Sequence, residues 1–275
     1  MPAEREEEQS RKLWHSFEIF KNSSIKQDNM NEDKVKVGVY GHTGRLGEPL
    51  MGILREHPNT DIVYTESRSS GKRGDLEETD TVFMALPPGT SEEYLPSLEG
   101  KRIIDLSPDH RSDWVYGLPE SRREEIREAE RVANPGCYAT SIILGLAPLQ
   151  DEVNEVYISA VSGISGAGMK PKGEDNFLSY EEGRKHYQIE EMEKYLDAEI
   201  VSFSPTRIDN TEKGILSSIF ARTEDFEDIY ETYEDFYKGE EFVKIEEGTV
   251  QTKDVNGTNL CRMKTVQNDK GLEVI

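Results

Sequence analysis

The sequence predicts an α/β protein in which a parallel-sheet domain precedes a mixed α+β domain. Three observations predict this class. Valine-rich strand patterns alternate with helical or turn segments from Lys34 to Leu106, as βαβ units require. A glycine-rich turn separates the first strand pattern from the first helix pattern. Beyond Cys137 the character changes, and strands and helices follow in a mixed order.

Length and charge narrow the range of functions. The 275 residues are enough for one large domain or two ordinary ones. A net charge of −22 and the lack of a basic stripe argue against nucleic acid and anionic membranes as partners. The acidic excess is also compatible with high salt. The two cysteines and the charged N-terminus lead us to expect a cytoplasmic protein without disulfides, and we assign no metal site.

In the first half, residues 1–34 are polar and are interpreted as an N-terminal extension. The Val-rich alternation predicts a strand at Lys34–Tyr40. A helix is predicted to follow at Leu46–Glu56, and His57-Pro58 ends it because the residue before a proline disfavours helical geometry. The remaining strand patterns are Asp61–Thr65, Thr81–Leu86 and Arg102–Leu106. Residues 35–137 are therefore predicted to form a nucleotide-binding domain.

In the second half, the apolar run Ile142–Leu149 fits either a buried helix or a buried strand. Residues 138–275 are predicted to form the α+β domain. Its other predicted strands are Val156–Ser162, Ile200–Phe203, Ile215–Arg222 and Thr258–Lys264, and its helices are Glu190–Leu196 and Glu224–Lys238. The aromatics of the last helix have near-helical spacing, which indicates a packing face.

The glycine-rich turn follows a predicted strand and precedes a predicted helix. Its GxxGxxG spacing is a relative of the Rossmann dinucleotide fingerprint, in which glycines let the backbone approach a pyrophosphate at the helix start. Such a loop alone is a weak signal, and its strand–turn–helix position strengthens it. The candidate cofactor residues here are Gly41, Thr43, Gly44, Arg45, Leu46 and Gly47.

The end of the next strand distinguishes between two cofactors. Ser67, Arg68 and Lys72 suit the 2′-phosphate of NADP. Glu66 is a competing signal, because an acidic residue there binds the ribose hydroxyls of NAD. We favour NADP.

Cys137 follows a Pro-Gly turn and precedes the apolar run. If that run is a helix, the thiol lies at its N-terminus, where backbone N–H groups and the helix dipole favour a thiolate. A nucleophile is commonly presented in this way. The alternative is an inert buried thiol, and the local sequence leaves both open.

Taken together, the motifs resemble the N-acetyl-γ-glutamyl-phosphate reductase family over roughly residues 35–275. The ordered set is more specific than any single motif. It comprises Gly41–Gly47, Ser67-Arg68 with Gly71-Lys72, the segment from Val82 to Pro87, Ile104–Ser107 with Asp109 and Arg111, Tyr116–Glu120, Asn134–Tyr138, Ser162–Gly168 and Gly214–Leu216.

The resemblance implies NADP-dependent reduction of an acyl phosphate to an aldehyde in arginine biosynthesis, with Cys137 forming a thioester. It also implies a homodimer or homotetramer built through the second domain. Pro87 joins the cofactor residues. The expected substrate residues are Arg111, Asn134 and Arg207, together with Ser162, Gly163, Ser165, Gly166, Ala167 and Gly168 of a donor-rich loop.

Two positions and the chain length depart from the family pattern. His186 matches the first histidine of a His-x-His segment, and Gln188 stands where the second would be. His186 is therefore our general acid/base candidate, with an idle histidine as the alternative. Thr206 replaces a usual histidine, so Arg207 is assigned to a carboxylate or phosphate. The chain also ends early for the family.

Two further functions stay open. One is a related reductase that acts on carrier-bound aminoadipyl or glutamyl phosphate, or on aspartyl phosphate. The other is a catalytically weak family member kept as a binding or structural subunit, which the glutamine at 188 and the short C-terminus favour.

Overall fold

The computed structural model describes residues 34–153, 155–167, 173, 176–222, 228–268 and 271–275. The chain divides into two compact units, residues 1–135 and 136–275. Cys137 therefore lies in the second unit, whereas the predicted domain boundary placed it at the end of the first. Apart from Lys34, the predicted extension lies outside the described residues.

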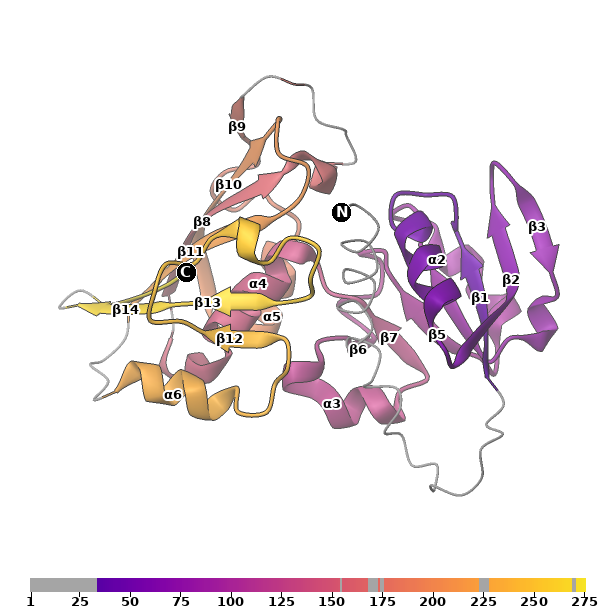
Figure 1. Cartoon of the computed structure of the whole chain (residues 1–275), viewed down its shortest axis with the longest axis horizontal. Helices are drawn as coiled ribbons and strands as arrows, with labels where there is room; N and C mark the ends of the chain where they lie inside the picture. Colours follow the sequence, from indigo (N-terminus) through magenta and orange to yellow (C-terminus); the bar gives the residue numbers. More distant parts are fainter. Residues whose placement is uncertain (1–33, 154, 168–172, 174–175, 223–227, 269–270) are drawn as a thin grey trace, which may run out of the picture. The chain divides into compact units, whose positions relative to one another are not determined.

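The first unit is built on a seven-stranded sheet with the order β3-β2-β1-β4-β5-β7-β6. All neighbouring strands are parallel except β2 and β3, which form an antiparallel hairpin (Figure 1). The strands are β1 (Val35–Tyr40), β2 (Thr60–Ser67), β3 (Gly71–Gly74), β4 (Thr81–Met84), β5 (Arg102–Asp105), β6 (Val115–Tyr116) and β7 (Arg131–Ala133).

Helix α2 (Gly47–Glu56) covers one face of this sheet. Its apolar positions recur at helical spacing, so Leu50, Met51 and Leu54 pack together on Val37 and Val39 of β1. The opposite face carries a second cluster that includes Tyr40, Tyr64, Val82, Met84, Leu98 and Ile103. Helix α3 (Pro119–Glu128) starts with proline, which fits the first turn of a helix.

The second unit contains a six-stranded sheet with the order β14-β15-β11-β8-β10-β9 and a parallel pair, β12 and β13. Strands β8 and β10 are parallel, and the other neighbours are antiparallel. The strands are β8 (Glu155–Gly163), β9 (Phe177–Ser179), β10 (Glu199–Ile208), β11 (Ile215–Ala221), β12 (Val243–Ile245), β13 (Cys261–Met263), β14 (Thr265–Asn268) and β15 (Gly271–Val274).

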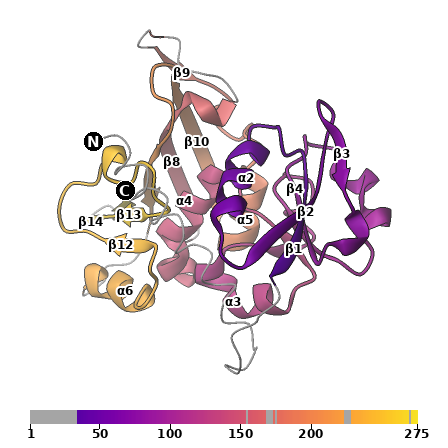
Figure 2. The same ribbon diagram turned by 45° about the vertical axis from the view of Figure 1, so that its right-hand side comes forward.

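Helices α4 (Cys137–Leu146) and α5 (Ile189–Leu196) pack on this sheet, against β11 and β10 respectively (Figure 2). The run after Cys137 is therefore a helix, and seven of its ten residues are buried. In helix α6 (Ile229–Phe236) the predicted packing face is confirmed for Tyr233, which is buried and whose hydroxyl donates to the Gly145 carbonyl at 2.7 Å, whereas Phe236 is 46% exposed. Residues 223–227 of the predicted helix are outside the described part. Short 3₁₀ turns connect these elements: η2 (Leu76–Glu78), η3 (Ser91–Glu93), η4 (Leu95–Leu98), η5 (Ala147–Glu152), η6 (Ile164–Ala167) and η7 (Thr252–Asp254).

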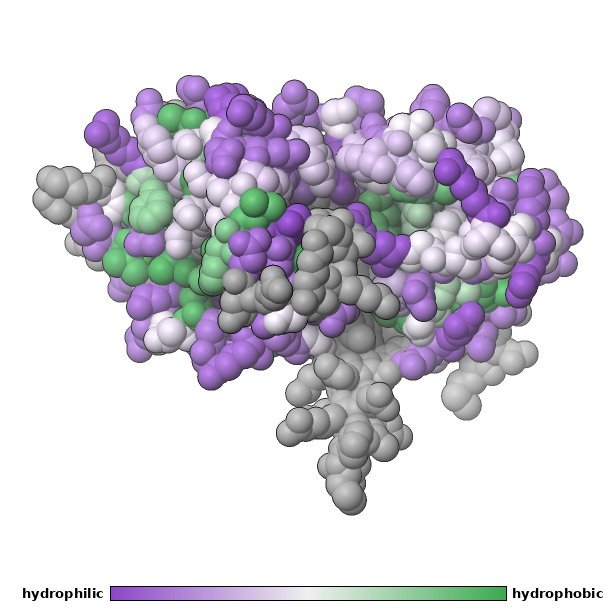
Figure 3. Space-filling model, turned by 90° about the horizontal axis from the view of Figure 1, so that it is seen from above, coloured by the Kyte–Doolittle hydropathy of each residue, from purple (hydrophilic) through white to green (hydrophobic). Residues whose placement is uncertain are grey.

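Hydrophilic side chains dominate the face drawn in Figure 3, as the charge composition predicts. The second unit nevertheless exposes apolar side chains on the sheet. Tyr157 of β8 and Phe220 of β11 are directly paired across the two strands, and they are 47% and 43% exposed. Alternate residues of β8 are buried, so these aromatics point away from α4 and α5. Among the described helices, none has the length and apolar character to cross a membrane.

Candidate active site

Cys137 is the first residue of α4, and its side chain is exposed. Gly136 before it is extended, with φ −70° and ψ 149°, so the chain turns directly into the helix. Backbone N–H groups at a helix start favour negative charge, which suits a thiolate. An inert core thiol, the alternative from the sequence, does not agree with this exposure.

Tyr138 lies behind Cys137 and is buried. Burial raises the pKa of its hydroxyl, and a hydrogen bond with the Ser162 side chain opposes this shift. The same hydroxyl lies 3.2 Å from that of Tyr180. Tyr138 is therefore a neutral phenol that links the start of α4 to Ser162 at the end of β8.

His186 is buried among aromatic rings, with its ring centroid 5.4 Å from that of Tyr138 and 5.1 Å from that of Phe203. Its Nδ1 accepts the Gln188 backbone N–H at 3.3 Å, which leaves the proton of the neutral ring on Nε2. Nε2 lies 3.9 Å from the Glu181 carboxylate. Burial lowers the pKa of His186 and Glu181 opposes the shift, so the ring is neutral at pH 7.

The structure places Cys137 and His186 in one unit. Tyr138, the residue after Cys137, is in ring contact with His186. Among the described residues, no hydrogen bond or ion pair joins the thiol to the imidazole. The acid/base role of His186 therefore stays a prediction at this point.

Backbone N–H groups of the predicted donor loop are already hydrogen-bonded to another segment of the second unit. The N–H groups of Gly163, Ile164 and Ser165 donate to the carbonyls of residues 214, 211 and 212 at 2.8–3.0 Å. These amides do not face a ligand, because carbonyl oxygens of the same unit already occupy them. The hydroxyls of Ser162 and Ser165 are the side-chain donors that the predicted loop offers, and Gly168 lies outside the described residues.

Both predicted substrate arginines contact their own chain. Arg207 Nε donates to the Asp209 carboxylate at 2.8 Å, and Asp209 also accepts from Asn176. Arg111 Nε donates to the Asn134 carbonyl at 3.0 Å in the first unit. Arg111 thus holds the backbone segment that leads toward Cys137, a role that the sequence did not indicate.

The glycine loop at the end of β1 is tightly packed. Gly41 has a φ of +73°, and a Cβ on it would lie 2.1 Å from the Ala85 carbonyl oxygen. A Cβ on Gly47, the first residue of α2, would lie 2.1 Å from the Gly41 carbonyl oxygen. Only glycine allows this close approach of the loop and the helix start. The predicted loop residues Thr43, Arg45 and Leu46 are exposed around it.

A chain of hydroxyl groups connects this loop to the turn between β2 and β3. Thr43 lies 2.8 Å from Ser69, and Ser67 lies 3.2 Å from Ser69 and 2.9 Å from Ser70. Ser70 in turn lies 3.0 Å from Nε2 of His42, whose buried Nδ1 has no partner among the described residues. Arg68 is exposed on the same turn. Such a cluster of donors beside a guanidinium fits a phosphate group.

Glu66, the competing signal for NAD, is already engaged. Its carboxylate accepts the Tyr64 hydroxyl and lies 3.6 Å from Lys72 Nζ. The hairpin β2–β3 creates this pairing, because Glu66 and Lys72 are cross-strand neighbours. Lys72 is thus a partner of Glu66, and Ser67 and Arg68 remain as the phosphate candidates.

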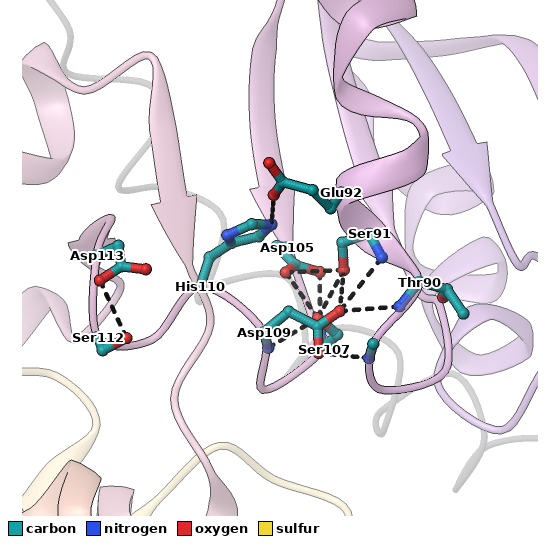
Figure 4. A network of polar contacts seen from close by, with 10 residues as sticks. Thr90, Ser91, Glu92, Asp105, Ser107, Asp109, His110, Ser112 and Asp113 are labelled. Atoms are coloured by element: carbon teal, nitrogen blue, oxygen red, sulfur yellow. Dashed lines mark hydrogen bonds and ion pairs between the residues drawn. The ribbon is translucent and has the colours of Figure 1, made fainter.

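A buried polar network follows β4 and β5 in the first unit (Figure 4). The Asp105 carboxylate is fully buried and accepts the Ser107 backbone N–H and hydroxyl at 2.9 and 2.7 Å. Asp109 accepts the backbone N–H groups of Gly89, Thr90 and Ser91 at 2.7–3.2 Å. The two carboxylates thereby fix the loop that begins at the predicted cofactor residue Pro87.

His110 completes this network. It stacks on Trp114 at 4.0 Å between ring centroids, and its Nε2 lies 3.8 Å from the Glu92 carboxylate. Sequence reasoning singled out Asp109 only as part of a motif, and the Gly89–Ser91 contacts became visible only in the fold.

Replacing Asp109 by asparagine should loosen this loop. Burial alone would raise the pKa of Asp109, but the hydrogen bonds from Gly89, Ser91 and Thr90 outweigh it and lower the pKa. A lowered pKa stabilises the fold above about pH 4, and that stabilisation is lost as the pH falls through the folded-state value. We expect the free energy of unfolding at pH 7 to drop by roughly 1–3 kcal/mol.

Urea unfolding at pH 7 and at acidic pH checks this expectation. The gap between the wild type and Asp109→Asn should narrow as the pH falls. Asp113→Asn is the matched control, since Asp113 is exposed and accepts one hydrogen bond from Ser112 at 3.1 Å. Equal unfolding energies for wild type and Asp109→Asn at pH 7 would show that the carboxylate does not hold the loop.

Two site residues were not identified as such from the sequence. Glu191 accepts the Gly136 N–H at 2.6 Å, and Gln188 accepts the Ala139 N–H at 3.0 Å. The only sequence signal was the position of Gln188 within the histidine segment. No cluster of metal-ligating side chains occurs among the residues that were searched, which are the described ones.

Comparison with known families matches both units. Residues 72–129 match the semialdehyde dehydrogenase NAD-binding domain, and residues 137–275 match the semialdehyde dehydrogenase dimerisation domain. The N-acetyl-γ-glutamyl-phosphate reductase of Geotalea daltonii is 35% identical, over 82% of this chain and 84% of that protein. The Thermus thermophilus enzyme of the same name is 32% identical, over 85% and 87%.

Solved structures share the fold. Aspartate semialdehyde dehydrogenase II of Vibrio cholerae superposes with a TM-score of 0.66 at 18% identity, over 88% of this chain and 92% of that one. The Candida albicans aspartate semialdehyde dehydrogenase, solved with NADP, gives a TM-score of 0.67 at 13% identity, again over 88% and 92%. These similarities confirm the predicted α/β class, with a parallel nucleotide-binding sheet and a second α+β domain.

Proposed function

The chain belongs to the N-acetyl-γ-glutamyl-phosphate reductase family of semialdehyde dehydrogenases, and on that premise we propose that it reduces N-acetyl-γ-glutamyl phosphate with NADPH. The products are N-acetylglutamate semialdehyde, inorganic phosphate and NADP, a step of arginine biosynthesis in the cytoplasm. The observation that carries the proposal is the exposed Cys137 at the first position of α4.

The Cys137 thiolate attacks the acyl carbon of the substrate, and the bond from that carbon to the phosphate oxygen breaks. Phosphate leaves and a thioester remains on Cys137. NADPH, when bound, supplies the hydride that reduces the thioester carbonyl. The resulting hemithioacetal on Cys137 loses the thiolate and becomes the aldehyde, so the sulfur returns to its starting state.

His186 is the group we assign to proton transfer at the hemithioacetal oxygen. Its neutral ring carries the proton on Nε2, which lies 3.9 Å from the Glu181 carboxylate. The hydroxyl of Ser162, which hydrogen-bonds with Tyr138, is the donor we assign to the substrate phosphate or oxyanion. Asn134 precedes the nucleophile by three residues and is exposed for substrate contact.

The first unit fits NADPH by its own geometry. Gly41 and Gly47 let the loop pack tightly against Ala85 and the start of α2, and His42 Nδ1 is buried without a partner among the described residues. The loop would hold the pyrophosphate, and the turn with Ser67 and Arg68 would hold the 2′-phosphate. Pro87 lies on the loop that Asp109 anchors, and we assign it to the nicotinamide side.

Replacing Arg68 by alanine should raise the KM for NADPH by about 10- to 100-fold, because a charge-assisted contact with the 2′-phosphate is lost. The KM for NADH should stay the same, since NADH lacks that phosphate. Lys72→Ala is the matched control, as Lys72 pairs with Glu66. A preference of the wild type for NADH would overturn the assignment.

The alternative of a carrier-bound substrate needs a basic docking patch. Lys170 and Lys172 lie outside the described residues, and Arg184 is engaged by the Glu193 carboxylate at 2.7 Å. Lys185 is the other candidate among the described residues. We favour the free acetylated substrate because the matching relatives are named N-acetyl-γ-glutamyl-phosphate reductase.

We infer that two copies associate through the open face of the six-stranded sheet. Tyr157 and Phe220 form an exposed aromatic pair there, beside Leu216, which is 38% exposed. The second unit matches a dimerisation domain, and its helices already cover the opposite face. A charge at the centre of this face, Phe220→Asp, should convert the oligomer to monomer in sedimentation experiments.

The substrate assignment is tested by the reverse reaction. Phosphate-dependent reduction of NADP is measured with N-acetylglutamate semialdehyde, aspartate semialdehyde and a carrier-bound semialdehyde. Turnover with the acetylated substrate alone is the expected result. Turnover with a different semialdehyde would transfer the assignment to that substrate, and no turnover with any of them would favour a binding or structural subunit.

A further inference from the structure

Helix α4 starts without a cap of its own. Its N-cap residue is Gly136, which has no side chain to accept a hydrogen bond from the first turn. The first backbone N–H groups of a helix need acceptors from elsewhere. This start carries Cys137, so its order matters more than that of an ordinary helix end.

The acceptors come from the segment that begins α5. Glu191 Oε1 accepts the N–H of the N-cap residue Gly136 at 2.6 Å, across 55 positions of sequence. Gln188 Oε1 accepts the N–H of Ala139, the third helical residue, at 3.0 Å across 49 positions. These are the two N–H groups that a capping box satisfies from within one helix. Here both oxygens are supplied by another segment of the same unit.

Gln188 is held in one orientation. Its Nε2 donates to the Tyr187 hydroxyl at 3.0 Å, which leaves the amide oxygen for Ala139. Its backbone N–H donates to Nδ1 of His186 at 3.3 Å. Gln188 is 2% exposed and Glu191 is 8% exposed, so neither side chain has solvent as an alternative partner. The N-terminal end of the α4 dipole favours an acceptor oxygen at this place.

We propose that Gln188 and Glu191 are positioning residues for Cys137. They fasten the N-cap and third residue of α4 from both sides of the nucleophile, and they tie that turn to the segment that carries His186. The amide of Gln188 carries no titratable proton, so Gln188 acts by holding the Ala139 N–H in place and not by proton transfer. The proposal rests on the proposed role of Cys137 as nucleophile.

Alanine variants of the two residues test this role. Gln188→Ala and Glu191→Ala should each lower kcat by about 10- to 100-fold, because the thiol is no longer held in line with the acyl carbon. The KM for NADPH should not change. Alkylation of Cys137 by iodoacetamide, measured without substrate, should follow a single exponential in the wild type. In the alanine variants it should become multiphasic, because the first turn of α4 frays. Glu190→Ala is the matched control, since Glu190 is exposed on α5.

Conservative variants separate positioning from a general loss of structure. Gln188→Glu and Glu191→Gln keep an acceptor oxygen at the same reach, and each should retain kcat within about 5-fold of wild type. If either lost as much activity as its alanine counterpart, or if the alanine variants kept wild-type kcat, the proposal would be overturned. Amide hydrogen exchange of the peptide that contains Cys137 tests the proposal even in a variant with little activity. Exchange should be faster in Glu191→Ala, and unchanged protection would refute the proposal.

The outcomes distinguish this proposal from the proposed function. Alkylation and hydrogen exchange need no substrate, so an error in the substrate assignment leaves them unaffected. Full activity of Cys137→Ala would defeat the mechanism, whereas failure of the positioning role would appear only in the variants at 188 and 191.

Discussion

Cys137→Ser should lower kcat by at least about 10³-fold, while the dissociation constant for NADPH stays at the wild-type value. A serine hydroxyl keeps the size of the side chain but is far less nucleophilic than a thiolate near neutral pH. The thiol lies at the first position of α4, and its exposure means that the substitution removes little packing. A change in kcat without a change in cofactor binding would identify a chemical role.

Cys261→Ser is the matched control, because Cys261 lies in the small β12–β13 sheet, away from α4 in the sequence. It should retain wild-type activity. The wild type is incubated with the acyl phosphate in the absence of NADPH and then quenched. Mass spectrometry should detect an acyl group on Cys137. Catalysis that persists in Cys137→Ser, or acylation at another residue, would contradict the thioester mechanism.

Four of the seven strands of the first sheet, β1, β2, β4 and β5, were predictable from the sequence, because buried parallel strands are apolar runs. The predicted Thr81–Leu86 and Arg102–Leu106 agree with β4 and β5 to within two residues at each end. Strands β3, β6 and β7 were missed. Strands β6 and β7 are only two and three residues long, and the sequence of β3, Gly-Lys-Arg-Gly, has no apolar pattern and pairs with β2. Tertiary pairing, which a local pattern does not contain, created strand β3.

The site was predictable where its signal was local. The Pro-Gly turn and the apolar run fitted either a buried helix or a buried strand after Cys137, and the structure selects the helix, with Cys137 as its first residue. The partners of Arg207 and Arg111 were not predictable: a short-range pair with Asp209 and a carbonyl 23 residues away hold them. In the sequence, Gln188 was noted only as the residue in place of the family's second histidine. Its contact with Ala139 could not be predicted, because it depends on the packing of α5 against α4.

Gly47→Ala is the second substitution with a large expected effect. A Cβ at this position would lie 2.1 Å from the Gly41 carbonyl oxygen and 2.7 Å from the His42 Cα, and both are backbone atoms that cannot rotate away. The glycine loop must therefore move off the start of α2. We expect NADPH affinity to fall by about 100-fold and the free energy of unfolding to fall by roughly 1–3 kcal/mol.

Gly52→Ala in the same helix is the matched control for that substitution. No atom lies within 4 Å of its Cβ position, so alanine should be tolerated there and should stabilise the helix by up to about 1 kcal/mol. Fluorescence titration with NADPH and urea unfolding of both variants give the two quantities. Wild-type affinity in Gly47→Ala would mean that NADPH does not approach this loop. Since both variants add one methyl group to α2, a selective loss at position 47 would locate the pyrophosphate at the turn between β1 and α2.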